Sequence, residues 1–288
     1  MAVDPVQLVL NAAAISSLYA LVALGFTLIF GVGEVLNFAH GALLTVGAYA
    51  GIYAVTDLGM SRWTALVVAA ATAGVVGAAM YRGVVVHVRD RSVVTIIVTL
   101  ILGFTVQAVI GSLFGGGTIT LQSPLPGVTQ VLGRDIQTHF VLVFVLSWTA
   151  IGLVLSFVNY TRTGKAVLAT NMSSKGAAIV GIEADRINTY IWGVAAALAG
   201  LAGVLLVAFQ TGSPSMGLSP MVLSFSIVIL GGLGSIRGSI VGAYIIGFLD
   251  TATTTIIDPS LTGLTGLLIL VVVLLVRPRG LFGRETSD

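Results

Sequence analysis

The sequence has no cysteine, and only 8% of its 288 residues are charged. Without cysteine the chain can form neither disulfides nor thiolate metal sites, and its three histidines (His40, His87 and His139) are too scattered for a recognisable metal motif. A soluble domain carries roughly 25% charged residues, so this chain cannot cover its own surface with polar groups. We therefore expect a protein whose solvent is lipid and which binds no cofactor of its own.

Apolar residues make up 57% of the chain, and many lie in runs near the ~20 residues that a helix needs to cross a bilayer. These runs predict helices at Val6–Phe30, Trp63–Val86, Val93–Phe114, His139–Val158, Ile187–Phe209, Ser239–Ile257 and Leu261–Val276. Two further segments, Val35–Val55 and Met221–Leu233, are interrupted or short, and each fits a full crossing, a broken helix or a re-entrant piece. The predicted fold class is all-α: a polytopic membrane helical bundle of about eight or nine spans, forming one domain over residues 1–288.

Lysine and arginine are concentrated in two loops and at the C-terminus. They are Arg82, Arg89 and Arg91; Arg162, Lys165, Lys175 and Arg186; and Arg277, Arg279 and Arg284. Basic loops stay on the cytoplasmic side of a membrane, so all three regions, including the C-terminus, are predicted to be cytoplasmic. No basic residue precedes Arg62, so eight spans with the N-terminus inside and nine with it outside both fit. The net charge of +2 gives no basic stripe for nucleic acid.

A polar stretch interrupts the apolar run from Val32 to Val55. Polar side chains in hydrocarbon cost free energy and usually persist where they face a partner, a water-filled cavity or a solute. Asn37, His40, Gly41 and, about one turn further on, Thr45 are therefore candidates for lining a solute pathway. Alternatively, the amide and the imidazole satisfy backbone groups that are freed where a helix is interrupted, and touch no solute.

The loop from Asn159 to Asn188 is much longer than the 2–8 residues that usually connect neighbouring helices. Ser174 is placed to cap a short helix that runs toward Gly181 and exposes a small apolar face. Such a face suits docking into a groove on a partner protein, and the alternative is a surface helix in the headgroup region. The candidate docking residues are Lys175, Ala177, Ala178, Val180 and Gly181.

Four parts of the chain match the pattern of one known family. They are Gly33–Gly51, the loop elements Gly164–Ala166 and Ala177–Ile182, the glycine-rich Gly231–Gly238, and Arg277–Gly283. On these segments, and over nearly its whole length, the chain resembles the LivH-type permease subunits of ABC importers for branched-chain amino acids. The resemblance implies a type II ABC importer-like fold in the cell's inner or plasma membrane.

The same resemblance implies a set of partners. They would be a second, homologous permease, two cytoplasmic ATPases and an extracytoplasmic binding protein that docks on the outer loops Gly115–Gln137 and Gln210–Pro220. The loop helix would be the coupling helix that seats in an ATPase. ATP would be bound by those partners, because the chain has no G-x-x-x-x-G-K-[ST] phosphate loop of its own. Transport would proceed by alternating access.

Other functions are weighed against this one. A permease for urea or short amides in the same family would have much the same sequence. A passive channel for small solutes would also be apolar and glycine-rich, but it would not need the long basic loop. A proton- or sodium-coupled carrier would show ionisable residues deep in its spans, and an enzyme would show a catalytic constellation. The sequence offers few of the former and no recognisable example of the latter.

Overall fold

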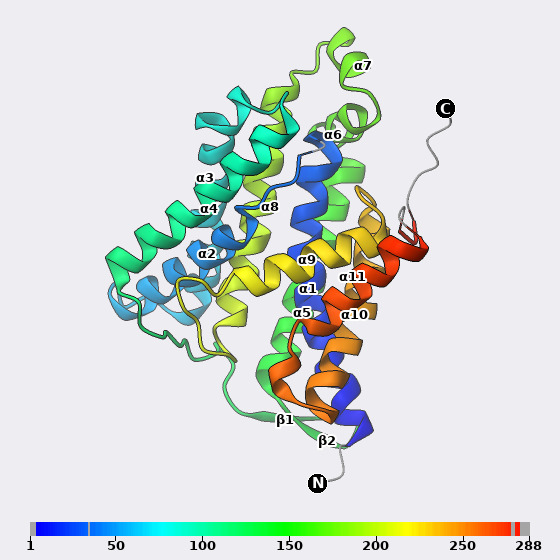
Figure 1. Cartoon of the computed structure of the whole chain (residues 1–288). Coiled ribbons are helices and arrows are strands. Elements are labelled where there is room, and N and C mark those ends of the chain that lie inside the picture. Colours follow the sequence, from blue (N-terminus) through cyan, green and yellow to red (C-terminus); the bar gives the residue numbers. More distant parts are fainter. Residues whose placement is uncertain (1–3, 34, 278–279, 283–288) are drawn as a thin grey trace.

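The computed structural model describes residues 4–33, 35–277 and 280–282, which form an all-α bundle (Figure 1). Its long helices are α1 (Pro5–Gly33), α3 (Arg62–Gly83), α4 (Ser92–Phe114), α5 (Thr138–Tyr160), α8 (Ala184–Leu206) and α10 (Ile236–Ile256). Its shorter helices are α2 (His40–Thr56), α6 (Arg162–Met172), α7 (Ser174–Ile179), α9 (Leu218–Gly231) and α11 (Leu264–Val276). Two 3-10 turns, η1 (Val85–His87) and η2 (Pro259–Leu261), complete the helical elements of the described part.

The predicted helix ends lie within three residues of the observed ends, except at one place. Helix α2 begins at His40, five residues after the predicted Val35, so the interrupted segment is a broken helix. Among the described residues, six helices are long and apolar enough to cross a membrane, and α9 and α11 are shorter apolar helices. The predicted eight or nine spans are reached only when the short α2, α9 and α11 are counted as partial crossings.

A small β-hairpin was not predicted. Strands β1 (Val128–Val131) and β2 (Arg134–Gln137) pair antiparallel in the connection before α5. Leu132 and Gly133 form the turn with positive φ angles of 52° and 74°. Strands of four residues give too short an alternation of apolar and polar residues to stand out beside long apolar helices.

Most basic residues of the α3–α4 and α5–α8 connections gather at one end of the bundle, whereas Arg62 and Arg134 lie toward the hairpin end. Helices α6 and α7 and the α3–α4 connection lie at the end opposite the hairpin and the start of α1 (Figure 1). Leu281 and Phe282, just beyond α11, donate backbone hydrogen bonds to the carbonyls at the end of α9, away from the hairpin. Arg279 and Arg284 lie outside the described residues.

Helix α1 fills the middle of the bundle. Within its apolar window 83% of the residues are buried, and it packs against α5, α8, α9 and α10. Around it, small residues let helix backbones approach closely, which is how helices associate in lipid. A Cβ added to Gly47 of α2 would collide with the backbone of Gly200 on α8. The centre of this subunit is therefore occupied by a closely packed helix.

An ion pair anchors the start of α8 at the basic end. Arg89, which follows α3 and η1, pairs with Asp185 in the first turn of α8. The same guanidinium donates a hydrogen bond to the hydroxyl of Tyr81 at 3.1 Å. Both partners of the pair are partly exposed, so the pair contributes little to stability by itself. Its effect is positional, because it ties the exit of the α5–α8 loop to the α3–α4 connection.

Candidate functional site

The predicted pathway residues lie together at the break between α1 and α2, and all four are buried. Asn37 is 1% exposed, and its Oδ1 accepts a hydrogen bond from the backbone N–H of Ala39 at 3.0 Å. Its backbone carbonyl accepts from the N–H of His40 at 3.3 Å. The Asn37 side chain therefore satisfies one backbone N–H where the helix restarts, as interrupted backbone in lipid requires, while its Nδ2 has no hydrogen-bond partner among the described residues.

His40 is fully buried and bonds to α1. Its Nε2 lies 3.1 Å from the carbonyl oxygen of Val22, and because a carbonyl only accepts, Nε2 carries the proton. The edge of the imidazole meets Phe26, with ring centroids 5.9 Å apart and planes at 87°. Gly25 makes room for it, since a Cβ there would lie 2.9 Å from His40 Cε1 and 2.8 Å from the carbonyl of Ala195 on α8. The imidazole is thus clamped where α1, α2 and α8 meet.

Gly41 and Thr45 lie where α2 crosses the start of α9. A Cβ added to Gly41 would collide with the carbonyl of Gly217, and one added to Gly217 would collide with the carbonyl of Gly41. Thr45 Oγ1 donates to the carbonyl of Gly41 at 3.2 Å and would lie 2.8 Å from a Cβ on Gly217. Two backbones are therefore in direct contact, and glycine at both positions is what allows it.

Half-exposed aromatic rings mark a surface at this break that the sequence did not reveal. The Phe38 ring lies on the irregular segment and the Phe225 ring on α9, with centroids 6.1 Å apart. Both residues are partly exposed, as is Leu36. The N–H of Phe38 donates to Oγ1 of Thr99 on α4 at 3.2 Å. Phenylalanine in an apolar sequence gives no signal, so only the tertiary arrangement identifies these rings.

The predicted docking loop forms a projecting knob, residues 172–181, at the basic end of the bundle (Figure 1). Ser173 caps α7, with its Oγ accepting a hydrogen bond from the N–H of Gly176 at 3.0 Å, so the prediction of Ser174 as the cap was wrong by one residue. Helix α7 ends at Ile179, and Gly181 reverses the chain with a φ of 80°. The N–H of Ile182 then donates to the carbonyl of Ala177 at 3.0 Å, which closes the knob.

The knob exposes apolar side chains. Ile179 is 86% exposed, Val180 is 72% exposed, and Met172 is 78% exposed. Of the predicted docking residues, Lys175, Ala178, Val180 and Gly181 are exposed, whereas Ala177 is only 3% exposed and holds the knob from inside. Ile179 was missing from the predicted set, because the sequence does not show which side of a six-residue helix faces outward.

The described part of the chain has no candidate metal site, because no three histidine, aspartate or glutamate side chains lie close enough together there to hold an ion. The histidines occupy separate places. His40 bonds to α1, and His139 Nδ1 lies 2.9 Å from Ser123 Oγ near the hairpin.

Comparison with known proteins finds relatives that match this chain over almost its full length. Residues 8–276 match the family described as the permease component of branched-chain amino acid transport systems. The chain is 28% identical to the high-affinity branched-chain amino acid transport system permease protein LivH of Escherichia coli (strain K12), over 98% of this chain and 96% of the relative. It is 30% identical to a probable branched-chain amino acid transport permease protein LivH of Methanocaldococcus jannaschii, over 93% and 89%.

The fold also has a solved counterpart. A chain of PsaBC from Streptococcus pneumoniae, solved in complex with Fab, superposes with a TM-score of 0.52 over 95% of this chain and 93% of that chain. Sequence identity is 14%, so this likeness concerns the fold alone. The full-length family match goes further and includes both the broken helix and the knob. The chain therefore belongs to the family of permease components of branched-chain amino acid transport systems.

Proposed function

We propose that this multi-pass membrane protein imports branched-chain amino acids as one of two permease subunits of an ABC importer. The observation that carries the proposal is the family match over residues 8–276, which covers the broken helix, the knob and the central α1. The relatives named above are permeases for branched-chain amino acids, which supports that substrate class. Because α1 fills the subunit's axis, the solute pathway lies between two permeases.

The knob is the proposed contact with the ATPases. Apolar side chains exposed on a polar loop mark interaction sites, and Ile179 and Val180 are both more than two-thirds exposed. A short helix with an apolar face fits a groove on a partner. Two permeases present two knobs, one for each of two ATPase subunits. The positive-inside rule then makes the knob end, with the C-terminus, cytoplasmic.

The face around the α1–α2 break is the proposed wall of the pathway and contact with the second permease. Irregular backbone at membrane depth is tolerated only against protein or a water-filled cavity, not against lipid. The irregular segment bears Leu36 and Phe38, which are half-exposed beside Phe225. In this proposal these three side chains form the wall's surface. The predicted pathway residues Asn37, His40, Gly41 and Thr45 hold that wall in shape from behind.

The hairpin end is the proposed docking site for the binding protein. Two connections that the sequence assigned to the outside are joined there. Ile119 and Gly212 exchange backbone hydrogen bonds of 2.9 and 2.8 Å, and the N–H of Leu121 bonds to the carbonyl of Val207. A joined pair of loops can transmit docking to α5 and α9, provided that the binding protein contacts the two states of the permease differently.

Reconstitution tests the function directly. The permease is placed in proteoliposomes with its partner permease, both ATPases and the binding protein, and uptake of labelled leucine and labelled urea is compared. We expect ATP-dependent leucine uptake that disappears when the ATPases are omitted. ATP-dependent uptake of urea without leucine would instead identify a short-amide permease. Uptake by the permease alone would identify a passive channel.

A further inference from the structure

The helices on the two sides of the knob are attached to the bundle in different ways. Helix α8, which follows the knob, is held to its neighbours by backbone contacts. A Cβ added to Gly200 would collide with the carbonyl of Ala69 on α3, and one added to Gly203 would collide with the carbonyl of Leu44 on α2. The ion pair between its first turn and the α3–α4 connection adds a further tie. Helix α8 is therefore a fixed support for the knob.

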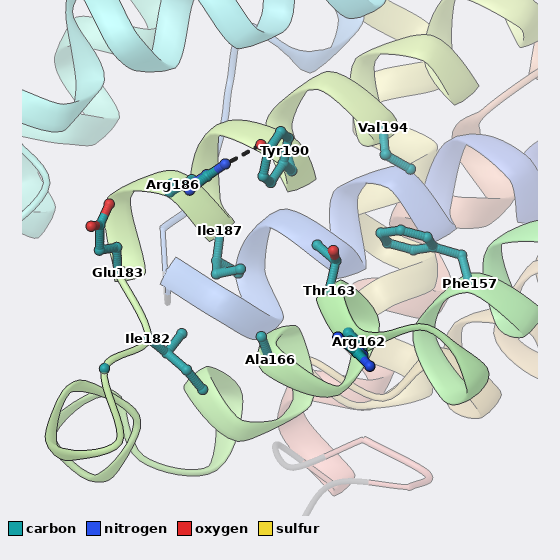
Figure 2. Close-up of a pocket in the computed structure, with 11 residues that line it drawn as sticks. Phe157, Arg162, Thr163, Ala166, Ile182, Glu183, Arg186, Ile187, Tyr190 and Val194 are labelled. Atoms are coloured by element: carbon teal, nitrogen blue, oxygen red, sulfur yellow. Dashed lines mark hydrogen bonds between the residues drawn. The ribbon is translucent and has the colours of Figure 1, made fainter.

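Helix α5, which leads to the knob through α6, is free on the side that faces α8. It packs along α1 and barely touches α8. A cleft of about 580 Å³ separates α5 and α6 from α8 near the knob, with Phe157 of α5 and Val194 of α8 among its walls (Figure 2). A second hollow, of about 800 Å³, lies between Leu146 of α5 and the paired helices α3 and α8. The half of α5 nearer the knob therefore has room to move toward α8.

The other half of α5 is held by hydrogen bonds. His139 Nδ1, at the hairpin end, lies 2.9 Å from Ser123 Oγ. Near the middle of the helix, Trp148 Nε1 donates to the Tyr244 hydroxyl on α10 at 2.7 Å. Beyond Trp148, the described residues of α5 make no side-chain hydrogen bond to α1, α8 or α10. A movement of α5 would therefore pivot about its hairpin half and be largest next to the knob.

The corner between α5 and α6 is closely packed and hydrogen-bonded. Thr161 Oγ1 donates to the carbonyl of Phe157 at 2.7 Å and accepts from the N–H of Gly164 at 2.9 Å. One hydroxyl thus joins the end of α5 to the start of α6, where it acts as the N-cap. A Cβ added to Gly164 would collide with the carbonyls of Phe157 and Val158, so the two backbones are in contact. Close-packed backbones transmit displacement, and the corner therefore keeps its angle when α6 moves.

We propose that Thr161 and Gly164 are positioning residues for coupling: they make α5 and α6 one rigid elbow, which carries movement of the knob to α5 and swings its nearer half into the cleft beside α8. The next corner, between α6 and α7, is capped in the same way by Ser173, so no flexible loop separates the knob from the elbow. Because α8 is fixed, a displacement of the knob is taken up by the elbow. The inference rests on the proposed contact between the knob and an ATPase.

A single substitution at the elbow tests this role. Thr161→Val keeps the branched shape of the side chain and removes the hydroxyl that joins the two helices. In proteoliposomes that hold the complete importer, we expect normal copurification of the ATPases and near-normal ATP hydrolysis. Leucine uptake per ATP hydrolysed should fall roughly fivefold, the order by which losing an N-cap side chain shifts an equilibrium. Thr161→Ser, which keeps the hydroxyl, should couple like the wild type.

Thr149→Val is the matched control, because the Thr149 hydroxyl bonds within α5, to the carbonyl of Val145 at 2.7 Å. It should leave uptake per ATP unchanged. Full coupling in Thr161→Val, or an equal loss in Thr149→Val, would overturn the elbow. If Thr161→Val fails to assemble, the distance measurement below decides.

Spin labels measure the movement itself, and the chain has no native cysteine to add background. Tyr160→Cys on α5 and Val75→Cys on α3, which lines the second hollow, report the distance between α5 and the fixed helices. In the complete importer, this distance should differ by several ångström between the nucleotide-free and ATP-bound states, and the shorter distance marks the closed cleft. Val75→Cys paired with Thr56→Cys on α2 should give one distance in both states.

A constant distance between Tyr160→Cys and Val75→Cys would overturn the inference, and so would an equal change in the control pair. Failure of the proposed function gives a different result. In that case the wild-type complex would show no ATP-dependent uptake of leucine, or its ATPases would not copurify with the permease.

Discussion

The break before α2 and the knob at α7 are exceptions of opposite kinds: the break buries polar side chains, and the knob exposes apolar ones. At the break, an amide and an imidazole are buried inside a membrane bundle. At the knob, isoleucine and valine project from a polar loop. The first anomaly is satisfied in part within the chain: Asn37 Oδ1 and His40 Nε2 bond to the backbone of Ala39 and Val22, whereas Asn37 Nδ2 and His40 Nδ1 have no hydrogen-bond partner among the described residues. The second is not, and exposed apolar side chains of this kind mark sites of contact with a protein or with the membrane.

This contrast separates residues that maintain shape from residues that make contact. Substitution at the break should change stability first, because its side chains bond and pack inside the subunit. Substitution at the knob should change assembly and leave the isolated permease intact. Four measurements test the distinction.

The largest expected effect is at the knob. In the proposed contact with an ATPase, Ile179→Asp would bury an unpaired charge, which costs about 3–5 kcal/mol and corresponds to more than a hundredfold loss of affinity. Copurification of the ATPase should be lost while the thermal unfolding of the isolated permease stays unchanged. The control is Leu132→Asp, at an equally exposed residue of the hairpin turn, which should assemble normally. An Ile179→Asp complex that assembles like the wild type would remove α7 from the docking surface.

The second effect is at the α2–α9 crossing. Gly217→Ala forces a methyl group into the carbonyl of Gly41, and such overpacking costs about 1–3 kcal/mol. Because Gly217 has an ordinary φ of −75°, the penalty is steric and not conformational. The midpoint of thermal unfolding should fall. Gly152→Ala in α5 is the control, since a Cβ there meets nothing within 4 Å, and it should be neutral or stabilising. Equal midpoints for the two variants would refute the backbone contact.

The third effect distinguishes shape from solute contact at His40. Removing the imidazole leaves the Val22 carbonyl without its side-chain donor, which costs about 2 kcal/mol for a buried group. His40→Ala should therefore lower the unfolding midpoint while the KM for leucine uptake stays unchanged. His87→Ala, at an exposed histidine, should change neither quantity. A shifted KM with an unchanged midpoint would place His40 in the pathway itself.

The smallest effect concerns the half-exposed rings. If Phe38 and Phe225 form the pathway wall, replacing either with alanine should lower the leucine uptake rate about fivefold, and the double variant should cost less than the sum of the two. Contacting aromatic pairs couple by roughly 1 kcal/mol in such cycles. Phe104→Ala on the exposed face of α4 is the control. Equal effects of all three single variants would mean that the rings face lipid.

The sequence predicted the spans well because lipid imposes one simple requirement on a crossing helix. Apolar runs near 20 residues have few alternatives, so six long helices appear at the predicted places. Helix ends were harder to predict where the chain is apolar but its backbone is irregular. The start of α2 was placed five residues too early, because the residues after Val35 are mostly apolar although the backbone there is irregular.

The candidate site was predicted only in part. Polar residues in hydrocarbon drew attention to Asn37 and His40, but the rings of Phe38 and Phe225 carry no polar signal and come from segments far apart in sequence. In the loop, Ala177 was predicted to dock and is buried, whereas Ile179 is the most exposed apolar residue of the knob. The spacing of apolar residues cannot predict which side of a six-residue helix is buried, because contacts with neighbouring segments decide that.

The sequence by itself determined that this chain lives in lipid, where its helices lie and that one loop projects from them, because hydropathy and charge act locally and are written residue by residue. The tertiary structure decided which polar groups are satisfied, which glycines touch and which apolar residues stay exposed. Those properties depend on neighbours from distant segments, as Gly41 meets Gly217 and His40 meets Val22. They distinguish the polar side chains that bond within the chain from the apolar side chains that stay exposed on it.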